Sequence, residues 1–572
     1  MAPGRKAAAA GLLAAAAGVA AAQLFAAAAR PEAAPLIAVG GAIINGTPTA
    51  VKEFAVRELG TNDKPALLTG IAVVLAVFAA VVGVAARRRR VFLPIGVAVL
   101  GAAGAAAALS RPAATWFDAV PAVFAALVAG AVLFWLLQRV PRRPAAKPNP
   151  GPSLNASRAQ RLLAKAAADE RPLLEADEDS RQSAQATNER SPRGTSSGAP
   201  STAADERSTL ARAEEDPASL TAAGRRAFLR AAALVAAGTV VAEAGALGLA
   251  RARSGAAGRT RAAIKLPAPQ DPANPPPGGV APGFTTPAST FYRVDTALTV
   301  PRIDPSSWRL KIHGMLGEEA TLSLDDLLKR PLIERDITLN CVSNEVGGPY
   351  IGTARWLGVP LSPLLRELGL DPRADQIVAR SAEGMTIGTP VTTALDGRDT
   401  MLAVGMNGQP LPHEHGFPVR MLTPGLYGYA GACKWIDEIE LTRFDQFDAY
   451  WVKRGWARIG TVKAASRIDK PKPFARLDAG AVTVAGVAWA QRRGIKKIEI
   501  SVDGGPWQPA HLLPVPSVDT WVQWRYTWRA TAGPHSLAVR ATDGTGATQT
   551  ATRATPFPSG ATGWHTITVT VG

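Results

Sequence analysis

Four long apolar stretches constrain this chain more than any other feature of its sequence. They comprise residues 7–29, 66–86, 91–109 and 119–138, each close to the ~20 residues that a helix needs to cross a bilayer. A soluble alanine-rich bundle is the alternative interpretation. We predict a four-helix transmembrane region at 1–139, in which the shorter apolar run at 35–45 is a re-entrant or surface segment.

Basic residues mark alternate ends of these stretches. Arg5 and Lys6 precede the first, arginines at 87–90 separate the second from the third, and a basic cluster from Arg139 follows the fourth. Because positive charge collects on the cytoplasmic side, both ends of the region are predicted to be cytoplasmic. Most of the net charge of +17 lies here, with 32 basic and 18 acidic residues (+14) in 1–265. This distribution favours contact with membrane lipid and argues against a nucleic-acid partner.

Residues 140–222 combine Ala, Ser, Pro, Glu and Arg with almost no aromatic side chains. Such a composition buries too little apolar surface to fold, so we predict a disordered cytoplasmic linker. A formal G-x-S-x-G match at 194–198 is discarded, because a catalytic serine elbow requires a strand before it and a helix after it.

The sequence GRRAFLR at 224–230 runs directly into an apolar stretch at 231–250. It resembles a twin-arginine export signal, although two arginines at the start of a cytoplasmic helix are the ordinary alternative. We predict a signal or fifth membrane helix at 223–252 and a Pro/Gly-rich spacer at 253–287. The remainder of the chain is then expected outside the cytoplasm, in a protein of the cell membrane.

The remaining residues, 288–572, have an ordinary globular composition and divide near Lys472. Before that point, helix-like segments at 323–329 and 361–368 alternate with strand patterns, which predicts an α+β domain at 288–471. After it, strand patterns separated by glycine turns predict a β-sandwich at 472–572. The predicted fold class is therefore multi-domain: a helical transmembrane bundle, an α+β domain and a β-sandwich.

The sequence lacks several common functional motifs. It contains neither G-x-x-x-x-G-K-[ST] nor G-x-G-x-x-G for phosphate binding, and no H-E-x-x-H zinc motif. The first histidine, His313, follows every apolar stretch, so those helices cannot offer histidine ligands to a haem. With Cys341 and Cys433 as its two cysteines, the chain can form neither a four-cysteine zinc site nor a multi-bridge disulfide scaffold.

Six blocks carry the remaining signal: FYRVDT at 291–296, LNCVSN at 339–344, ARWLG at 354–358, MNGQPLP at 406–412, HGFPVR at 415–420 and CKW at 433–435. In this order they resemble the catalytic domain of the sulfite oxidase family of molybdopterin enzymes. The C-terminal part is similar to that family's immunoglobulin-like dimerisation domain, through GVAW at 486–489, DGGPW at 503–507 and GWH at 563–565. The resemblance implies one Mo-molybdopterin per chain, two-electron oxo transfer and a homodimer.

Cys341 matches the family's protein ligand to molybdenum, and a thiolate suits a soft, redox-active metal. A disulfide with Cys433 and an inert buried thiol are the alternatives. Arg355 is either a structural anchor or a substrate-site cation that would act in catalysis. The resemblance also assigns cofactor contacts to six residues: Tyr292, Arg293, Cys341, His415, Arg420 and Lys434. In the first block the register of the arginine is ambiguous by one position.

Two departures from the family bear on the substrate. Val346 stands where sulfite-oxidising members have an anion-binding arginine, and Val404 replaces a tyrosine. The loss of a cation and a phenol argues against sulfite as the native substrate.

We therefore predict a membrane-anchored molybdenum oxidoreductase that acts outside the cytoplasm on a small sulfur- or nitrogen-containing molecule. An external cytochrome or quinone-linked subunit would exchange the electrons. Residues 451–500, with 12 basic and 3 acidic side chains, mark a surface for an anionic substrate or an acidic redox partner. The alternative function is a non-catalytic membrane protein with an extracellular immunoglobulin-like binding module and a structural Cys341–Cys433 disulfide.

Overall fold

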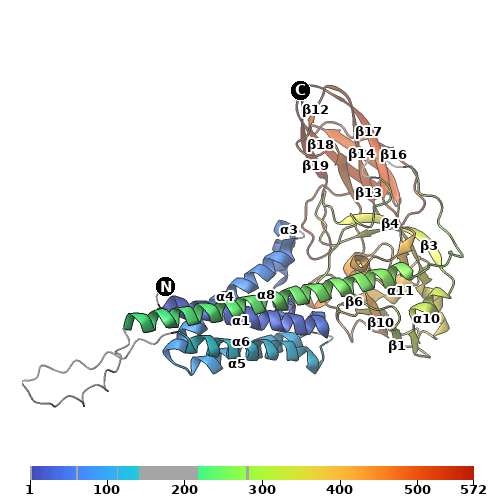
Figure 1. Ribbon diagram of the computed structural model, residues 1–572. Helices are drawn as coiled ribbons and strands as arrows, with labels where there is room; N and C mark the ends of the chain where they lie inside the picture. The colour runs from blue at the N-terminus through green and yellow to red at the C-terminus, as the bar shows by residue number, and fades with distance from the viewer. Residues whose placement is uncertain (1–2, 60–61, 112–113, 141–216, 279–282) are drawn as a thin grey trace, which may run out of the picture.

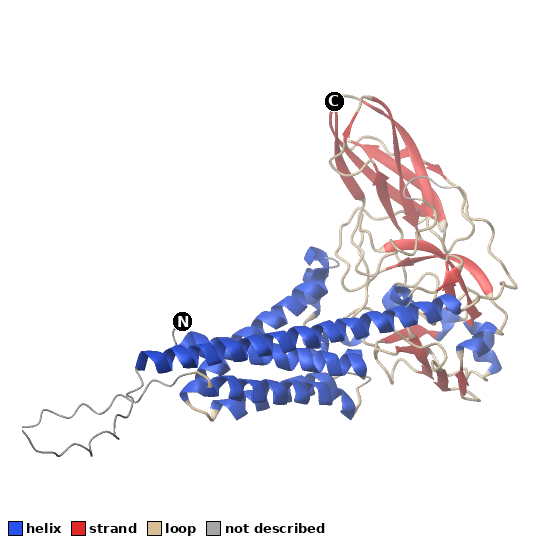
Figure 2. Ribbon diagram, in the orientation of Figure 1, coloured by secondary structure: helices blue, strands red, loops and turns tan. Residues whose placement is uncertain are grey.

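The computed structural model describes residues 3–59, 62–111, 114–140, 217–278 and 283–572. Helices form one end of the molecule, and two strand-rich domains form the other (Figures 1 and 2). The predicted linker and its G-x-S-x-G match lie outside the described residues, except for residue 140 and the start of α8. The helices of the bundle are α1 (Pro3–Ala28), α2 (Pro35–Gly46), α3 (Thr49–Leu59), α4 (Asp63–Arg88), α5 (Phe92–Leu109), α6 (Val120–Gln138) and α8 (Pro217–Ala263).

Five helices in the described part of the chain are long and apolar enough to cross a membrane: α1, α4, α5, α6 and α8. The first four agree closely in their bounds with the predicted apolar stretches. The short run at 35–45 is α2. By contrast, hydropathy did not predict α3, because charged residues interrupt its apolar ones.

Small residues let α1 pack tightly against its neighbours. A Cβ atom on Gly11 would lie 2.0 Å from the carbonyl oxygen of Ala79 in α4. One on Gly18 would lie 2.4 Å from the carbonyl oxygen of Ala125 in α6. Close backbone approach of this kind stabilises helix association in lipid. The pairing makes α1 antiparallel to α4 and α6, so the basic clusters of all three helices lie at the end of the bundle away from the strands (Figure 1).

The helix α8 is longer than the predicted membrane helix at 223–252. It has 47 residues and runs along the bundle into the strand-rich region (Figure 1). The end of the predicted linker and the first part of the predicted spacer at 253–287 are therefore helical. The reason is that no proline interrupts the sequence between Pro217 and Pro267.

The first strand-rich domain contains one mixed sheet, one antiparallel sheet and short helices. One sheet has the order β2-β1-β10-β5-β6 and the other the order β3-β4-β7-β8, with β9 paired to β7. Two predicted helix-like segments are the helices α9 and α10. The bounds are β1 (Leu310–Gly314), β2 (Ala320–Leu322), α9 (Leu324–Leu328), β3 (Ile333–Asn340), β4 (Ile351–Pro360), α10 (Leu361–Glu367), β5 (Gln376–Ser381), β6 (Thr386–Pro390), α11 (Val391–Ala394), β7 (Met401–Met406), β8 (Gln409–Pro410), η4 (His413–His415), β9 (Arg420–Leu422), α12 (Gly428–Gly431), β10 (Ile436–Thr442) and η5 (Val452–Arg454).

The second strand-rich domain consists of two sheets, ordered β11-β13-β17-β16 and β12-β19-β18-β14-β15. They share one apolar core, to which Trp524 contributes from the first sheet and Val539 from the second. This is the predicted sandwich, but it starts before the predicted boundary at 471/472, because β11 pairs with β13. The strands are β11 (Ala465–Lys470), β12 (Arg476–Leu477), β13 (Gly480–Trp489), β14 (Ile495–Val502), β15 (Gln508–Pro509), β16 (His511–Leu512), β17 (Val522–Ala530), β18 (Gly533–Asp543) and β19 (His565–Val571).

Candidate active site

A cavity of about 720 Å³ lies where the helical bundle meets the first strand-rich domain. Loops of that domain form much of its wall, the bundle adds side chains from α2, α3 and α4, and the sandwich adds Thr555 and Pro556. The wall brings together five of the six residues to which the resemblance assigns cofactor contacts: Tyr292, Cys341, His415, Arg420 and Lys434.

Cys341 follows the last residue of β3, so the strand places its thiol at the cavity wall. The Cys341 N–H donates to the carbonyl oxygen of Tyr350 at 3.0 Å, and the Asn344 N–H donates to the carbonyl oxygen of Cys341 at 3.1 Å. Burial raises the pKa of the Cys341 thiol. Both cysteines of the chain are free, so the alternative of a structural Cys341–Cys433 disulfide is wrong for this structure.

Arg420, the first residue of β9, brings a buried guanidinium to the cavity. Its Nη1 donates to the carbonyl oxygen of His415 at 3.1 Å, and the guanidinium carbon lies 5.0 Å from the ring centre of Trp356. Burial lowers the pKa of Arg420 to about 10, which leaves it charged at neutral pH. The buried Nε has no hydrogen-bond partner in the described part of the chain. A buried, unsatisfied donor of this kind fits an anionic ligand.

His415 is held neutral beside this arginine. Its Nε2 lies 2.8 Å from the carbonyl oxygen of Ala288 and therefore carries the ring proton, which leaves Nδ1 as an acceptor. Burial lowers the pKa of His415 to about 4, and the nearby charges of Arg420 and Lys434 act in the same direction.

Asp295 forms ion pairs with three cations at the cavity. Its Oδ2 accepts from Lys434 Nζ at 2.5 Å and from Arg293 Nε at 2.9 Å. Its Oδ1 accepts from Lys64 Nζ at 2.8 Å. Burial alone would raise the pKa of Asp295, but the three cations, Lys434 foremost, lower it below its usual range. Arg293 thus belongs to this ion-pair network and does not line the cavity, whereas Lys64 reaches the cavity from α4.

Glu383 also lines the cavity, although it belongs to none of the six sequence blocks. It lies in the turn between β5 and β6. Burial first, and then the Asp295 carboxylate, raise the pKa of Glu383 to about 7. A carboxyl group with this pKa can hold or release a proton near neutral pH. No local motif marks such a residue, because its environment comes from segments that are distant in sequence.

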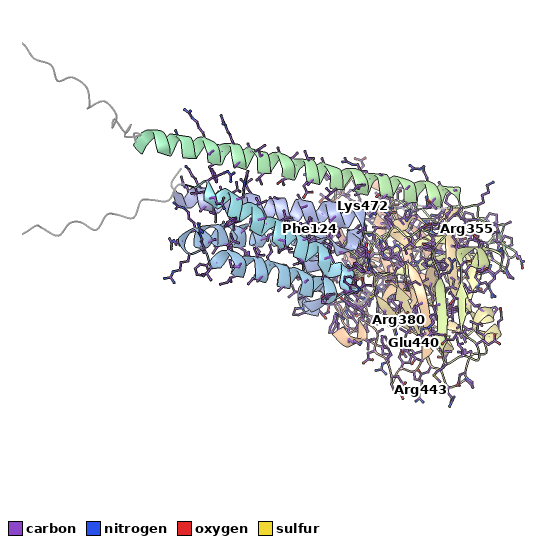
Figure 3. The ribbon with its side chains drawn as sticks, turned by 60° about the horizontal axis from the view of Figure 1, so that its bottom comes forward. Phe124, Arg355, Arg380, Glu440, Arg443 and Lys472 are labelled. Atoms are coloured by element: carbon purple, nitrogen blue, oxygen red, sulfur yellow. The ribbon has the colours of Figure 1, made fainter. Side chains whose placement is uncertain are left out.

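Arg355 lies outside the cavity wall, toward the end of the molecule away from the bundle (Figure 3). Its Nε and Nη2 donate to the two carboxylate oxygens of Asp336 at 3.0 and 2.8 Å, joining β4 to β3. Nη2 also donates to the carbonyl oxygen of Asn274. The pairing with Asp336 fits the structural anchor of the two interpretations, and Arg355 is not among the residues that line the cavity.

The cavity residues fit a molybdopterin cofactor. The pterin carries a phosphate and ring atoms that need fixed cations and directional donors, which Arg420 and Lys434 offer at the same wall. The thiol of Cys341 faces the same cavity, and a thiolate is a suitable ligand for molybdenum.

Residues 297–451 match the family model described as "Oxidoreductase molybdopterin binding domain". The mitochondrial sulfite oxidase of Mus musculus is 33% identical over 285 residues, which covers 42% of this chain and 51% of that protein. NADH nitrate reductase 1 of Oryza sativa subsp. japonica is 28% identical over 326 residues, which covers 46% of this chain and 35% of that protein.

The chain spans about half the length of the mammalian sulfite oxidases it matches. Among solved structures, the sulfane dehydrogenase SoxCD from Paracoccus pantotrophus is similar at 25% sequence identity and a TM-score of 0.43. That similarity covers 47% of this chain and 75% of the other.

Proposed function

This chain carries a molybdopterin-dependent oxidoreductase domain of the sulfite oxidase family, and from that premise we propose that it catalyses two-electron oxo transfer on a small sulfur- or nitrogen-containing molecule. The observation that carries the proposal is the convergence of Cys341, Arg420 and Lys434 on one cavity. When bound there, Mo-molybdopterin supplies the two-electron chemistry.

Each polar residue of the wall has a role that follows from its environment. Cys341 would hold the metal through its thiolate, while Arg420 and Lys434 would hold the phosphate and ring oxygens of the pterin. His415 would accept a hydrogen bond at Nδ1. Glu383 would hold the proton that oxo transfer exchanges with water, because its pKa lies near neutral pH.

Tyr292 would act as a neutral donor in the same wall. Burial raises the pKa of its phenol, and the nearby Cys341 acts in the same direction. The hydroxyl therefore keeps its proton at any physiological pH and can donate a hydrogen bond to the cofactor.

We propose that the bundle anchors the enzyme in the cell membrane with the cavity on the extracytoplasmic side. The basic clusters at the opposite end of the bundle support this orientation. The sandwich is proposed as an immunoglobulin-like dimerisation domain. An external cytochrome or quinone-linked subunit would exchange the electrons, since no histidine precedes His313 to ligate a haem in the helices.

Sulfite is disfavoured as the substrate. Val404 is buried in β7 within the apolar core, and neither it nor Val346 lines the cavity. The positions at which sulfite-oxidising relatives are expected to have an arginine and a tyrosine thus offer no polar group to an anion. The proposed reaction class is therefore the reduction of an S-oxide or N-oxide, or the oxidation of a reduced sulfur compound other than sulfite.

The test is molybdenum analysis of the full chain, purified from a host that makes the cofactor. We expect about one molybdenum per chain. Cys341→Ser should abolish turnover and lower the metal content, whereas Cys433→Ser, the matched change at the second thiol of the same wall, should retain both. Wild-type protein without molybdenum would contradict the function. Dye-linked assays with sulfite, S-oxides and N-oxides identify the substrate, and fast sulfite oxidation would contradict the argument from Val346 and Val404.

A further inference from the structure

The helical bundle supplies part of the cavity wall itself. Ile43 at the end of α2, Val51 and Lys52 on α3, and Leu67 on α4 line the cavity together with the molybdopterin-binding residues. The helix α3 projects from the bundle toward the sandwich (Figure 1). The cavity is therefore composite, and the first strand-rich domain alone would not enclose it.

Polar contacts fix this part of the bundle on the domain. Arg454 Nη2 donates to the carbonyl oxygen of Asn45 at 3.1 Å, and the Thr49 hydroxyl donates to the carbonyl oxygen of Arg454 at 3.0 Å. At a second position, Arg261 of α8 donates to the carbonyl oxygens of Leu411 and Pro410 at 2.7 and 2.6 Å. These contacts join segments that are distant in sequence, so the helical wall is a built part of the site.

Lys52 brings a buried ammonium group to this wall. Its Nζ is buried and has no hydrogen-bond partner in the described part of the chain. The Nζ lies 5.6 and 5.7 Å from the ring centres of Tyr450 and Trp451. Burial, and then the neighbouring charge of Arg454, lower the pKa of Lys52 to about 8, so it is mainly protonated at neutral pH. A buried cation without an acceptor is costly and gains most from a bound anion.

The rest of the helical wall selects the kind of anion. Ile43, Val51 and Leu67 are apolar, and Trp451 and Trp456 add aromatic surface to the same cavity. A small inorganic anion would leave this surface without a partner. An organic anion would place its apolar body against it and its charge at the ammonium.

We propose that Lys52 is the substrate-binding cation of this cavity and that the substrate is an organic anion whose apolar body packs against α2–α4. The inference rests on the proposed function and deepens it by naming the substrate class. Lys52 would also supply a positive charge to the substrate site, which the uncharged Val346 cannot supply at the position of the family's arginine.

The test uses two related S-oxides that differ in charge, 4-(methylsulfinyl)benzoate and neutral methyl phenyl sulfoxide. Binding to the full, molybdenum-loaded chain in detergent is measured by calorimetry, for wild type and for Lys52→Gln and Lys52→Arg. Lys453→Gln is the matched control, because this exposed lysine also lies over an aromatic ring, that of Phe447 at 4.9 Å, but outside the cavity.

We expect Lys52→Gln to weaken binding of the benzoate by about 10- to 100-fold, the loss of one charge-assisted hydrogen bond, and to leave the neutral sulfoxide unchanged. Lys52→Arg should keep most of the affinity, and Lys453→Gln all of it. The proposal would be overturned if Lys52→Gln lowered the affinity for both ligands equally or left the affinity for the benzoate unchanged. It would also be overturned if the benzoate did not bind to wild type.

Turnover with a reduced dye separates this inference from the proposed function. If the benzoate binds in a Lys52-dependent way but no S-oxide or N-oxide is turned over by molybdenum-loaded protein, the reaction class fails and the anion site stands. If turnover is normal and its KM for the benzoate is the same in Lys52→Gln, the anion site fails and the reaction class stands.

Discussion

The Tyr450 hydroxyl donates a 2.8 Å hydrogen bond to Oδ1 of Asn45, across 405 positions of sequence. Asn45 lies in the last turn of α2, and Tyr450 lies just before η5 in the molybdopterin domain. The same Asn45 accepts from Arg454 through its backbone carbonyl. The bond thus ties the helical wall to the loop that carries Trp451, so the enclosure of the cavity depends on it.

Loss of this hydroxyl should loosen the helical wall without unfolding the protein. Tyr450→Phe removes one neutral hydrogen bond, about 1 kcal/mol, so amide hydrogen exchange in α3 should accelerate several-fold. Molybdenum content should stay at the wild-type level. Tyr526→Phe, on β17 of the sandwich, is the control. Exchange rates in α3 that do not change in Tyr450→Phe would show that other contacts hold the wall.

Packing within the bundle should be sensitive to a single methyl group in α4. A Cβ on Gly83 would lie 2.3 Å from the carbonyl oxygen of Ala7, whereas a Cβ on Gly70 of the same helix would meet no atom of the described residues within 4 Å. We expect Gly83→Ala to destabilise the bundle by about 1–3 kcal/mol through overpacking. Gly70→Ala should be neutral or slightly stabilising, since alanine favours helix. Thermal unfolding in detergent measures both, and equal melting temperatures would contradict the packing shown here.

The long apolar helices and the position of Cys341 could be predicted because their signals are local. Hydropathy over one helix length defines α4, and one short block places Cys341 at the end of a strand. The length of α8 could not be predicted in the same way. Its apolar core ends near residue 250, but the following Ala- and Arg-rich segment continues the helix until it meets the domain.

The composite nature of the cavity could not be predicted from sequence patterns. In the sequence, Lys52 stands beside Glu53 and Lys64 beside Asp63, a pattern typical of ordinary surface charges. Their positions at the cavity depend on the docking of helices against residues more than two hundred positions away, such as Asp295. Arg355 shows the opposite case, since its block suggested a role at the site but the fold pairs it with Asp336.

Removal of the Arg355 side chain should lower stability and leave chemistry intact. Asp336 is only 5% exposed, so Arg355→Ala would leave a buried carboxylate unpaired, at a cost of about 3 kcal/mol. Turnover per molybdenum should remain at the wild-type value, because Arg355 does not line the cavity. The double variant Arg355→Met, Asp336→Leu should regain part of the loss, since it leaves neither charge unpaired. A selective fall in turnover per metal would instead restore Arg355 to the substrate site.

Glu383 should make the stability of the protein fall as pH rises. Its pKa is raised from 4.5 to about 7 in the folded chain, so between these values the folded form binds more protons than the unfolded form. At pH 5 the Glu383 carboxyl group is protonated in the folded chain and costs little stability. At pH 8 it is charged, which lowers the free energy of unfolding by on the order of 2 kcal/mol relative to pH 5. The charged and titratable groups that set this pKa are Asp295, Lys434, Lys64 and Arg293.

Glu383→Gln should remove this dependence. Its melting temperature should match wild type at pH 5 and exceed it at pH 8, because the amide cannot become charged. If Glu383 also holds the proton used in oxo transfer, wild-type turnover should fall as pH rises through about 7, and the variant should be slow and without that fall. Glu345→Gln, at another carboxylate of the same wall, is the matched control. A difference of equal size in that variant would assign the effect to the wall in general and not to Glu383.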